Sequence, residues 1–297
     1  MRRAAAGKQL VLAVSGGRDS MALLHAAAQA APHSIVAVAT FDHATGEAAT
    51  RATQLVAEVA AELGLAVVIG RAASNGGSEA AWRDERRRFL SEVASATGGT
   101  VATAHTRDDQ IETVLMRVLR DAGARGLAGL YAASAVVRPL LSFSRDEVAE
   151  YARGATARWI EDPTNSSMRF FRNRVRHDLL PALARARPDL ETKLLDIAAR
   201  SSRWRGQLDG FAERVSQIGP DAASAVVAVD DLAGYSRADL TSIWPAIAAR
   251  VGLAMDWRGT ERAAAFTNAS RTGARIQLSG GWEIARRRAR FELRRWK

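Results

Sequence analysis

The sequence predicts an α/β protein, with a doubly wound parallel sheet followed by a smaller C-terminal α+β domain. Through roughly the first half of the chain, short apolar runs alternate with segments of helical length, which is the pattern of strands and helices in such a sheet. Beyond the polar stretch at 206–220, which is the weakest joint, this alternation is harder to follow. Because 297 residues exceed one typical domain, we expect a sheet domain over residues 1–214 and a small domain over residues 215–297.

The expected elements follow one another along the first half of the chain. Apolar runs predict strands at 10–14, 34–41, 66–70 and 100–105. Helical spacing predicts helices at 48–63, 78–97 and 108–120. In a parallel sheet the carboxyl ends of the strands lie at one edge, so polar residues that follow them should converge. The residues in question are Ser15, Asp42, His43 and His105.

The turn after the first strand has the composition of an anion-binding loop. Residues 15–20 have the sequence Ser-Gly-Gly-Arg-Asp-Ser, in which two glycines let the backbone approach a ligand closely. The helix that begins there adds unpaired N–H groups and a positive dipole. Asp19 beside an anion indicates a bridging divalent cation, so the turn predicts a nucleotide with Mg²⁺. The alternative is a plain strand-to-helix turn in which Asp19 or Ser20 caps the helix.

A second group of polar residues follows the strand expected at 100–105. Thr106 and Asp109 have the spacing of a capping box at a helix start. Asp108 and Glu112 lie four residues apart, so a helix would present both carboxylates on one face to a cation or an ammonium group. His105, at the strand end, is a candidate proton carrier or phosphate contact.

The composition excludes several kinds of site and favours a polyanionic partner. The chain has no cysteine, which excludes zinc–thiolate sites, iron–sulfur clusters and a persulfide-carrying cysteine. A net charge of +10 and a pI near 11.0 favour RNA, although an arginine-rich genome could produce part of that bias. No apolar run has the length of a membrane span and the start lacks the apolar segment of a signal peptide, so we expect a cytoplasmic protein with no membrane partner.

The loop at 15–20 resembles the PP-loop of the Rossmann-like N-type ATP pyrophosphatases, and several later blocks resemble one family among them, the tRNA(Ile)-lysidine synthetases. The matching blocks are TAHTRDDQIET (103–113), EAAWRDERRRFL (79–90, through Glu79, Arg83 and Arg87), RPLLSFSR (138–145) and WIEDPTNSSMRFFRN (159–173). The chain departs from the family pattern in having Asp42 where an asparagine is usual and Thr106 in place of a second histidine.

The resemblance implies an activity and a set of site residues. The reaction would join free L-lysine to the wobble cytidine of tRNA(Ile) with a CAU anticodon, through an adenylated cytidine, with ATP and Mg²⁺ as cofactors. The implied ATP-binding residues are Ser15, Gly16, Gly17, Arg18, Asp19, Ser20, Asp42 and His43, with Asp19 facing the metal. The implied catalytic residues are Asp19, Arg83, His105 and Asp109. The implied lysine-binding residues are Asp108, Asp109 and Glu112. The turn at 162–165 is expected to help shape the site.

Basic segments are the expected tRNA contacts. The resemblance assigns this role to Arg172, Asn173, Arg174 and Arg176. In the small domain, segment 282–297 predicts a strand with Phe291 and Leu293 packed inward and a basic outer face carrying Arg286 and Arg288; a solvated edge strand is the alternative.

Two other functions and one assembly stay open on the sequence alone. An ammonia-dependent amide synthetase of the same loop class, such as an NAD synthetase, is the rival enzyme. A non-catalytic ATP-binding module is the rival outside enzymology. A homodimer is also possible.

Overall fold

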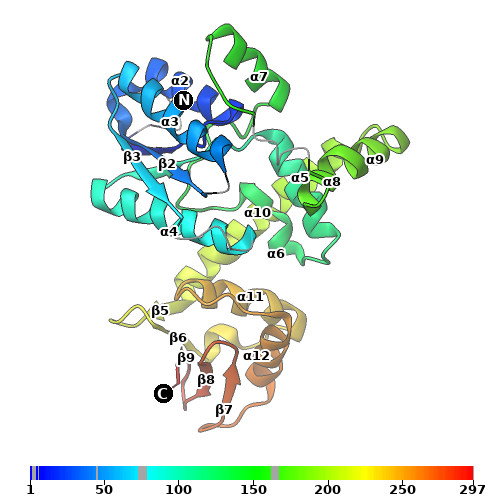
Figure 1. The fold of residues 1–297 in the computed structure, drawn as a ribbon. Coiled ribbons are helices and arrows are strands. Elements are labelled where there is room, and N and C mark those ends of the chain that lie inside the picture. Colours follow the sequence, from blue (N-terminus) through cyan, green and yellow to red (C-terminus); the bar gives the residue numbers. More distant parts are fainter. Residues whose placement is uncertain (2–4, 6, 45, 73–78, 162–166, 297) are drawn as a thin grey trace. The chain divides into compact units, whose positions relative to one another are not determined.

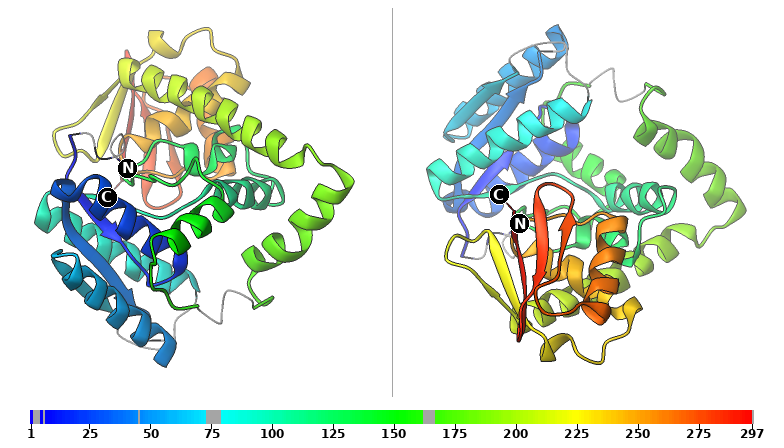
Figure 2. Two further views of the ribbon diagram at one scale, coloured as in Figure 1. Left: turned by 90° about the horizontal axis from the view of Figure 1, so that it is seen from above. Right: turned by 90° about the horizontal axis from the view of Figure 1, so that it is seen from below.

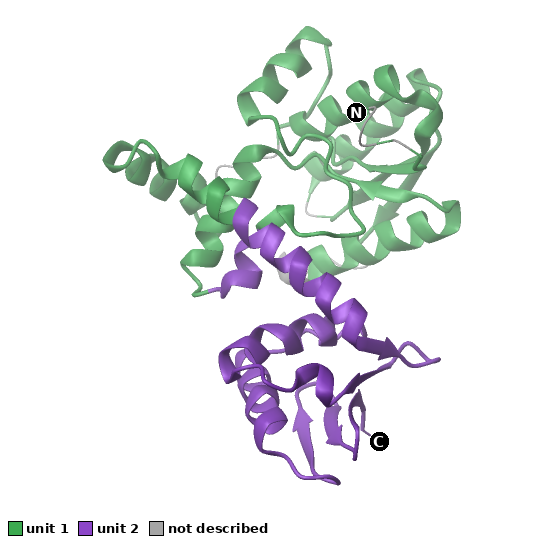
Figure 3. Ribbon diagram, turned by 180° about the vertical axis from the view of Figure 1, so that it is seen from behind, with its two compact units in different colours: residues 1–121, 129–198 green, residues 122–128, 199–297 purple. Residues whose placement is uncertain are grey.

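The computed structural model describes residues 1, 5, 7–44, 46–72, 79–161 and 167–296. The chain forms two compact units, which are coloured separately in Figure 3. Unit 1 comprises residues 1–121 and 129–198, and unit 2 comprises residues 122–128 and 199–297. The functional boundary predicted between residues 214 and 215 stays a prediction.

Unit 1 contains a four-stranded parallel sheet, as the sequence predicts. The strands are β1 (Leu10–Ala13), β2 (Ile35–Asp42), β3 (Val67–Arg71) and β4 (Thr100–Ala102), in the order β3-β2-β1-β4. The strand β1 lies inside the sheet and all four of its residues are buried. The sheet therefore turns its carboxyl edge, where β1 and β4 end, toward the loops that carry the predicted site residues.

Helices cover both faces of this sheet (Figures 1 and 2). Leu10 and Leu12 pack with α2 (Arg18–Ala30) and α3 (Glu47–Glu62). The alternate residues Val11 and Ala13 pack with α4 (Glu79–Thr97) on the opposite face. This alternation is the two-residue period of a strand buried on both sides, and it confirms the doubly wound prediction.

The remaining helices of unit 1 support the carboxyl edge. α5 (Arg107–Val118) follows β4, and α7 (Arg145–Gly154) packs on α2. The chain then forms α8 (Phe171–Arg174), the π-helical turn η4 (Val175–Leu179), α9 (Leu180–Ala186) and the start of α10 (Leu190–Val215). Val114 of α5 is fully buried in a cluster with Val175 and Leu194. Short 3₁₀ turns lie at η1 (Pro32–Ser34) and η2 (Gly129–Tyr131).

Unit 2 is an α+β domain with its own core. Its antiparallel strands are β5 (Ser216–Ile218), β6 (Ser224–Ala228), β7 (Arg275–Leu278), β8 (Trp282–Arg286) and β9 (Arg290–Arg295), in the order β5-β6-β9-β8-β7. Its helical elements are α6 (Ala124–Leu127), the rest of α10, η5 (Asp230–Leu232), α11 (Arg237–Ala249) and α12 (Trp257–Ala269). The core of this unit includes Trp244, Phe291 and Leu293.

The C-terminal strand packs as predicted but does not lie at the edge of its sheet. The inward packing of Phe291 and Leu293 is confirmed. The alternative of an edge strand is wrong, because β9 lies between β6 and β8. The stretch 206–220, predicted as a weak joint, is helical as far as Val215 because α10 runs through it. Within the described ranges, no helix is both long and apolar enough to span a membrane.

Candidate active site

The loop between β1 and α2 requires glycine at position 16. Gly16 has a φ of +82°, and a Cβ there would lie 2.7 Å from the carbonyl oxygen of Ala52 in α3. Gly17 caps α2 with ordinary extended backbone, and a Cβ there would meet only Ser15 Oγ, at 3.7 Å. Gly16 therefore serves the fold, while Gly17 leaves open space in front of the first turn of the helix.

Hydroxyl groups hold this loop together from inside. The buried Ser20 donates its hydroxyl hydrogen to Gly17 O at 2.8 Å and accepts from Ser15 N at 3.1 Å. No side chain caps α2 at Gly17, so the alternative in which Asp19 or Ser20 caps the helix is wrong. Asp19 instead accepts from Arg18 Nε at 3.0 Å and stays partly exposed. The loop is therefore preformed, with one carboxylate beside it.

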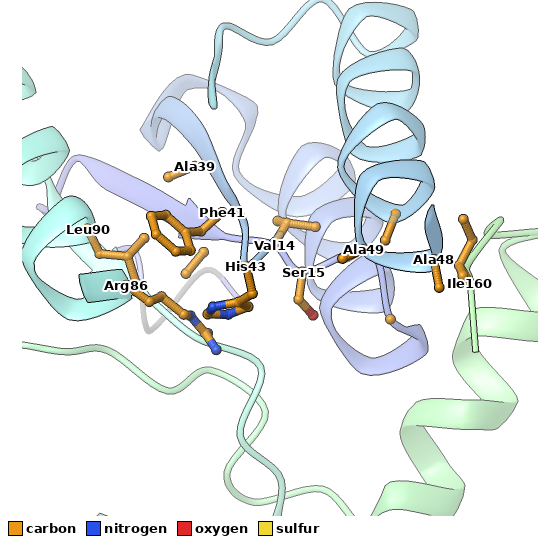
Figure 4. Close-up of a pocket in the computed structure, with 13 residues that line it drawn as sticks. Val14, Ser15, Ala39, Phe41, His43, Ala48, Ala49, Arg86, Leu90 and Ile160 are labelled. Carbon is orange, nitrogen blue, oxygen red and sulfur yellow. The ribbon is translucent and has the colours of Figure 1, made fainter. Parts of the chain in front are cut away.

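A cavity of about 160 Å³ opens beside the loop (Figure 4). Its lining comes from Ala13, Val14, Ser15, Gly17, Ala39, Phe41, His43, Ala48, Ala49, Ala52, Arg86, Leu90 and Ile160. Ile160 donates its N–H to Gly16 O at 3.0 Å, which fixes the segment after α7 against the loop. The small and apolar lining of the cavity suits a flat aromatic ring, and the anion-binding turn lies next to it.

The two residues at the end of β2 have different surroundings. Asp42 is buried, and its carboxylate accepts from Ala44 N at 2.8 Å and from the Thr50 hydroxyl at 3.1 Å. Both oxygens therefore hold the loop that follows β2. The His43 ring lines the cavity and meets Phe41 edge-on, with the ring centroids 5.0 Å apart.

Arg86 is a site residue that the sequence prediction missed. Its guanidinium lines the cavity, and in Figure 4 it extends to the same side as the His43 ring. Burial lowers the pKa of Arg86, and the neighbouring charge of Arg83 lowers it further. Arg87, which belongs to the matching block together with Arg83, is exposed, and its Nη1 lies 3.7 Å from Asp84 Oδ1. Helical spacing could have found Arg86, because the buried Leu90 and Val93 follow it by four and seven residues and so share its face of the helix.

His105 lies after β4, where the sequence predicts it, and its ring is neutral at pH 7. Thr103 Oγ1 lies 2.8 Å from His105 Nδ1. Burial lowers the pKa of His105 to about 4; the charge of Asp109 acts against this, and the charges of Arg172 and Arg86 add to it. The pKa of His105 therefore depends on the charge of Arg86, which lines the cavity, and on the charge of Asp109 in the first turn of α5.

The predicted capping box at the start of α5 is confirmed. Thr106 N donates to Asp109 Oδ2 at 2.7 Å, and Asp109 N donates to Thr106 Oγ1 at 3.4 Å. Thr106 is completely buried. At the position where the family pattern has a second histidine, this chain therefore has the N-cap of a helix.

Two buried carboxylates of α5 form an ion cluster with three partly buried arginines. The acid–arginine cluster consists of Asp109, Glu112, Arg145, Arg172 and Arg176. Glu112 Oε1 lies 2.9 Å from Arg145 Nη2 and 2.7 Å from Arg176 Nε. Arg172 bridges both acids, with 2.7 Å to Glu112 Oε2 and 2.7 Å to Asp109 Oδ1. The Glu112 side chain is only 1% exposed.

The electrostatics of this cluster are dominated by the arginines. Burial alone would raise the pKa of Glu112, but the hydrogen bond from Arg176 and the charges of Arg172 and Arg145 lower it to about 2. Glu112 is therefore ionised at every physiological pH. Because its oxygens already accept from three guanidinium groups, the cluster presents more positive than negative charge to its surroundings.

Asp108 and Glu112 share one face, as their spacing predicts. Both line a second cavity of about 130 Å³, together with Ile111, Arg145, Arg176, Leu180, Pro181 and Glu191. Asp108 accepts from Arg145 N at 2.8 Å and its side chain is 37% exposed. This cavity combines two accessible carboxylates, of Asp108 and Glu191, with two guanidinium groups and an aliphatic wall.

The unit 1 residues predicted to bind tRNA have partners within the protein. Arg172 and Arg176 belong to the acid–arginine cluster. Asn173 donates to Ser167 O at 2.9 Å, and Arg174 donates to Met168 O at 3.1 Å, so these two side chains fold onto the segment that precedes α8.

Arg286 and Arg288 lie in unit 2. Arg286 Cζ is 4.9 Å from the centroid of the Phe291 ring, and Arg288 is exposed in the turn after β8. The outer side of β9 also carries Glu292, which lies 3.0 Å from Arg287. This face is therefore mixed in charge, not purely basic as predicted. The turn at 162–165 lies outside the described residues.

Comparisons with known proteins identify the family of this chain. A family model described as a PP-loop domain matches residues 2–183. The tRNA(Ile)-lysidine synthase of Solibacter usitatus is 40% identical over 69% of this chain, but the match spans only 49% of that protein. Those of Salinispora tropica and Salinispora arenicola are 36% and 34% identical, over 92% and 96% of this chain and 83% and 90% of their own lengths.

A solved structure shows the same fold. The U34-tRNA thiolase NcsA of Methanococcus maripaludis aligns with a TM-score of 0.54 at 16% identity, covering 68% of this chain and 76% of that chain. At this identity the likeness concerns the fold alone. The family model and the two Salinispora proteins go further: the chain belongs to the PP-loop proteins and, among them, to the tRNA(Ile)-lysidine synthase family.

Proposed function

We propose that this chain joins lysine to the wobble cytidine of tRNA(Ile) with a CAU anticodon. In the first step the C2 carbonyl oxygen of the cytidine attacks the α-phosphorus of ATP and pyrophosphate leaves. In the second step the ε-amine of lysine attacks C2 and AMP leaves. The observation that carries the proposal is the preformed loop at 15–20 with its adjoining cavity, in a chain of this family.

ATP occupies the first cavity in this proposal. The backbone N–H groups of the loop at 15–20 hold its phosphates, since Gly17 leaves room there and the start of α2 adds positive charge. The ring of His43 lines the space for the adenine. Arg86, and Arg83 on the same helix, neutralise the leaving pyrophosphate. Asp42 contributes by holding the loop that carries His43.

Asp19 is the proposed ligand for Mg²⁺. Within the described residues no three His, Asp or Glu side chains gather as a metal cage. A single accessible carboxylate nevertheless fits Mg²⁺, which usually takes one or two carboxylates, with water and substrate phosphate completing its shell. When bound, the ion supplies positive charge that offsets the charge of the departing pyrophosphate. Asp19 meanwhile keeps its contact with Arg18, so its carboxylate is oriented before ATP arrives.

Lysine occupies the second cavity in this proposal. Asp108 and Glu191 are the accessible acids there. Asp108 holds an ammonium group in this proposal, while the aliphatic wall accepts the methylene chain. Asp109 and Glu112 act mainly by fixing the guanidinium groups that receive the lysine carboxylate. His105, which is neutral at pH 7, and Asp109 are the proposed groups that pass the proton lost by the amine on to water.

Basic residues of both units are the proposed tRNA contacts. The proposed contacts in unit 1 are Arg172, Asn173, Arg174 and Arg176. Those in the domain at 215–297 are Arg286 and Arg288. An anticodon loop is single-stranded, so its cytidine can leave the stack at low cost. These substrates place the proposed reaction in the cytoplasm. A homodimer stays a prediction, which sedimentation of the purified protein tests.

An assay with ATP labelled at the α-phosphate tests the proposal. We expect AMP and pyrophosphate, and we expect their formation to require both lysine and the cognate tRNA. Asp19→Asn should abolish Mg²⁺-supported turnover, whereas Asp84→Asn, an exposed aspartate of α4, should behave as wild type. Formation of ADP, or equal turnover with ammonia and no RNA, would contradict the proposal and favour the amide-synthetase alternative. Binding of ATP without any turnover would favour the non-catalytic module.

A further inference from the structure

Two tryptophans of unit 2 stand out by their exposure. Trp257 at the start of α12 is 75% exposed, and Trp296 directly after β9 is 47% exposed. The other five tryptophans of the chain are buried or half-buried. A large ring left in water contributes little to the stability of its own domain. This exposure indicates a surface that a partner covers.

Both tryptophans lie beside the same tight turn. Ser279 Oγ donates to Asp256 Oδ2 at 2.6 Å, which fixes the residue before Trp257 to the turn between β7 and β8. Trp296 N donates to Gly281 O at 3.0 Å, at the other end of the same turn. We call Trp257, Trp296 and the turn at 279–281 the tryptophan edge.

The charge around the tryptophan edge is positive. Arg258, Arg262 and Arg295 are exposed, and none of them is within 4 Å of an acid in the part of the chain that the structure describes. Of the nearby acids, Glu283 lies 2.9 Å from Arg294. Hydrogen bonds from Ser279 and Gly259 lower the pKa of Asp256, and the charges of Arg258 and Arg262 lower it further. Asp256 caps α12 by accepting from Gly259 N at 2.6 Å.

We propose that the tryptophan edge stacks on unpaired bases of the tRNA, while Arg258 and Arg295 meet the adjoining phosphates. The inference rests on the proposed function for its RNA substrate. Aromatic rings flanked by guanidinium groups suit single-stranded nucleic acid, because every base offers a flat face and every linkage a negative charge. Paired regions of RNA cannot present their base faces in this way. The positive surroundings favour this occupant over a second copy of the chain, which would bring like charge.

Binding measurements with the full chain test this inference. The dissociation constant of the cognate tRNA is measured over a range of salt concentrations for wild type, Trp257→Ala and Trp296→Ala. We expect each alanine variant to bind about 5- to 100-fold more weakly, as expected for the loss of one stacked base. The slope of log affinity against log salt should stay unchanged, because stacking releases no counterions. Trp257→Tyr should restore most of the affinity, and Tyr151→Ala, an exposed aromatic of α7, is the matched control.

Three outcomes would overturn the inference. One is an unchanged dissociation constant in an alanine variant that keeps the wild-type circular dichroism and melting temperature. Another is a loss of affinity with a flatter salt slope, which would assign the effect to phosphates. The third is a loss of self-association without a change in tRNA affinity, which would make the tryptophan edge an interface between copies. AMP formation by the wild-type protein reports separately on the proposed function, so either idea can fail without the other.

Discussion

Replacing Glu112 by glutamine should destabilise unit 1 markedly, because this buried side chain neutralises three partly buried guanidinium groups. The pKa of Glu112 falls from 4.5 to about 2 in the folded protein, and its side chain is 1% exposed. This difference corresponds to about 3 kcal/mol of stability at pH 7. Glutamine keeps the size of the side chain but removes the charge that Arg145, Arg172 and Arg176 share. Removal of one partner from a buried ion pair usually costs about 3–5 kcal/mol, which agrees with this value.

Hydrogen exchange of the α5 amides is the suitable assay, since it reports on unit 1 without requiring unit 2 to unfold with it. About 3 kcal/mol corresponds to roughly a hundredfold faster exchange in Glu112→Gln. Glu150→Gln, an exposed glutamate of α7, should change exchange by less than about threefold.

The stability contribution of Glu112 should depend on pH in a definite direction. Because the folded pKa is depressed, the contribution of Glu112 is fully present above pH 4.5 and is lost as the pH falls toward 2. The difference between variant and wild type, corrected for intrinsic exchange rates, should therefore be smaller at pH 3 than at pH 7. A difference below threefold at pH 7, or an equal difference at both pH values, would refute the account of the cluster.

Three further predictions concern the first cavity and its neighbour. Gly16→Ala should destabilise unit 1 by about 1–3 kcal/mol, because Gly16 has a positive φ and an added Cβ would lie 2.7 Å from Ala52 O. Gly17→Ala should have the melting temperature of wild type but bind ATP more weakly. Equal melting temperatures of the two variants would contradict this. The ring of His105 should show no NMR titration between pH 8 and pH 5.5, because burial lowers its pKa to about 4; a midpoint near 6.5 would be inconsistent with this environment. Arg86→Ala should weaken ATP binding at least tenfold in calorimetry, and Arg87→Ala should not; a loss of affinity in Arg87→Ala alone would contradict this placement of Arg86.

The sheet and its loop could be predicted from the sequence because the signals are local. The buried run at 10–13 shows a strand by composition alone, and the glycines at 16 and 17 mark the turn that follows it. The capping box of Thr106 and Asp109 is also local, since its partners are three residues apart. Each of these features depends on residues that lie within a few positions of one another in the sequence.

The partners of the acids could not be predicted in this way. Glu112 takes its arginines from α7 and from the segment around α8, and nothing in residue spacing shows that these segments meet α5. The sequence therefore does not show that Arg172 and Arg176, the proposed tRNA contacts, are also partners of Glu112. The sequence predicts Asp42 as an ATP-binding residue but does not show that the Thr50 hydroxyl of α3 donates to its carboxylate. The partners of these carboxylates are set by tertiary contacts, which residue type and spacing alone do not show.

The most direct test of the central claim is the position of lysine on the RNA. Labelled lysine, ATP and a transcript of tRNA(Ile) with a CAU anticodon are incubated with the protein, and the nucleosides are separated after digestion. We predict label in a modified cytidine from the first anticodon position, and none when that position is changed to uridine. Label elsewhere in the RNA, label retained in the uridine transcript, or consumption of ATP with no lysine in the RNA would contradict the account.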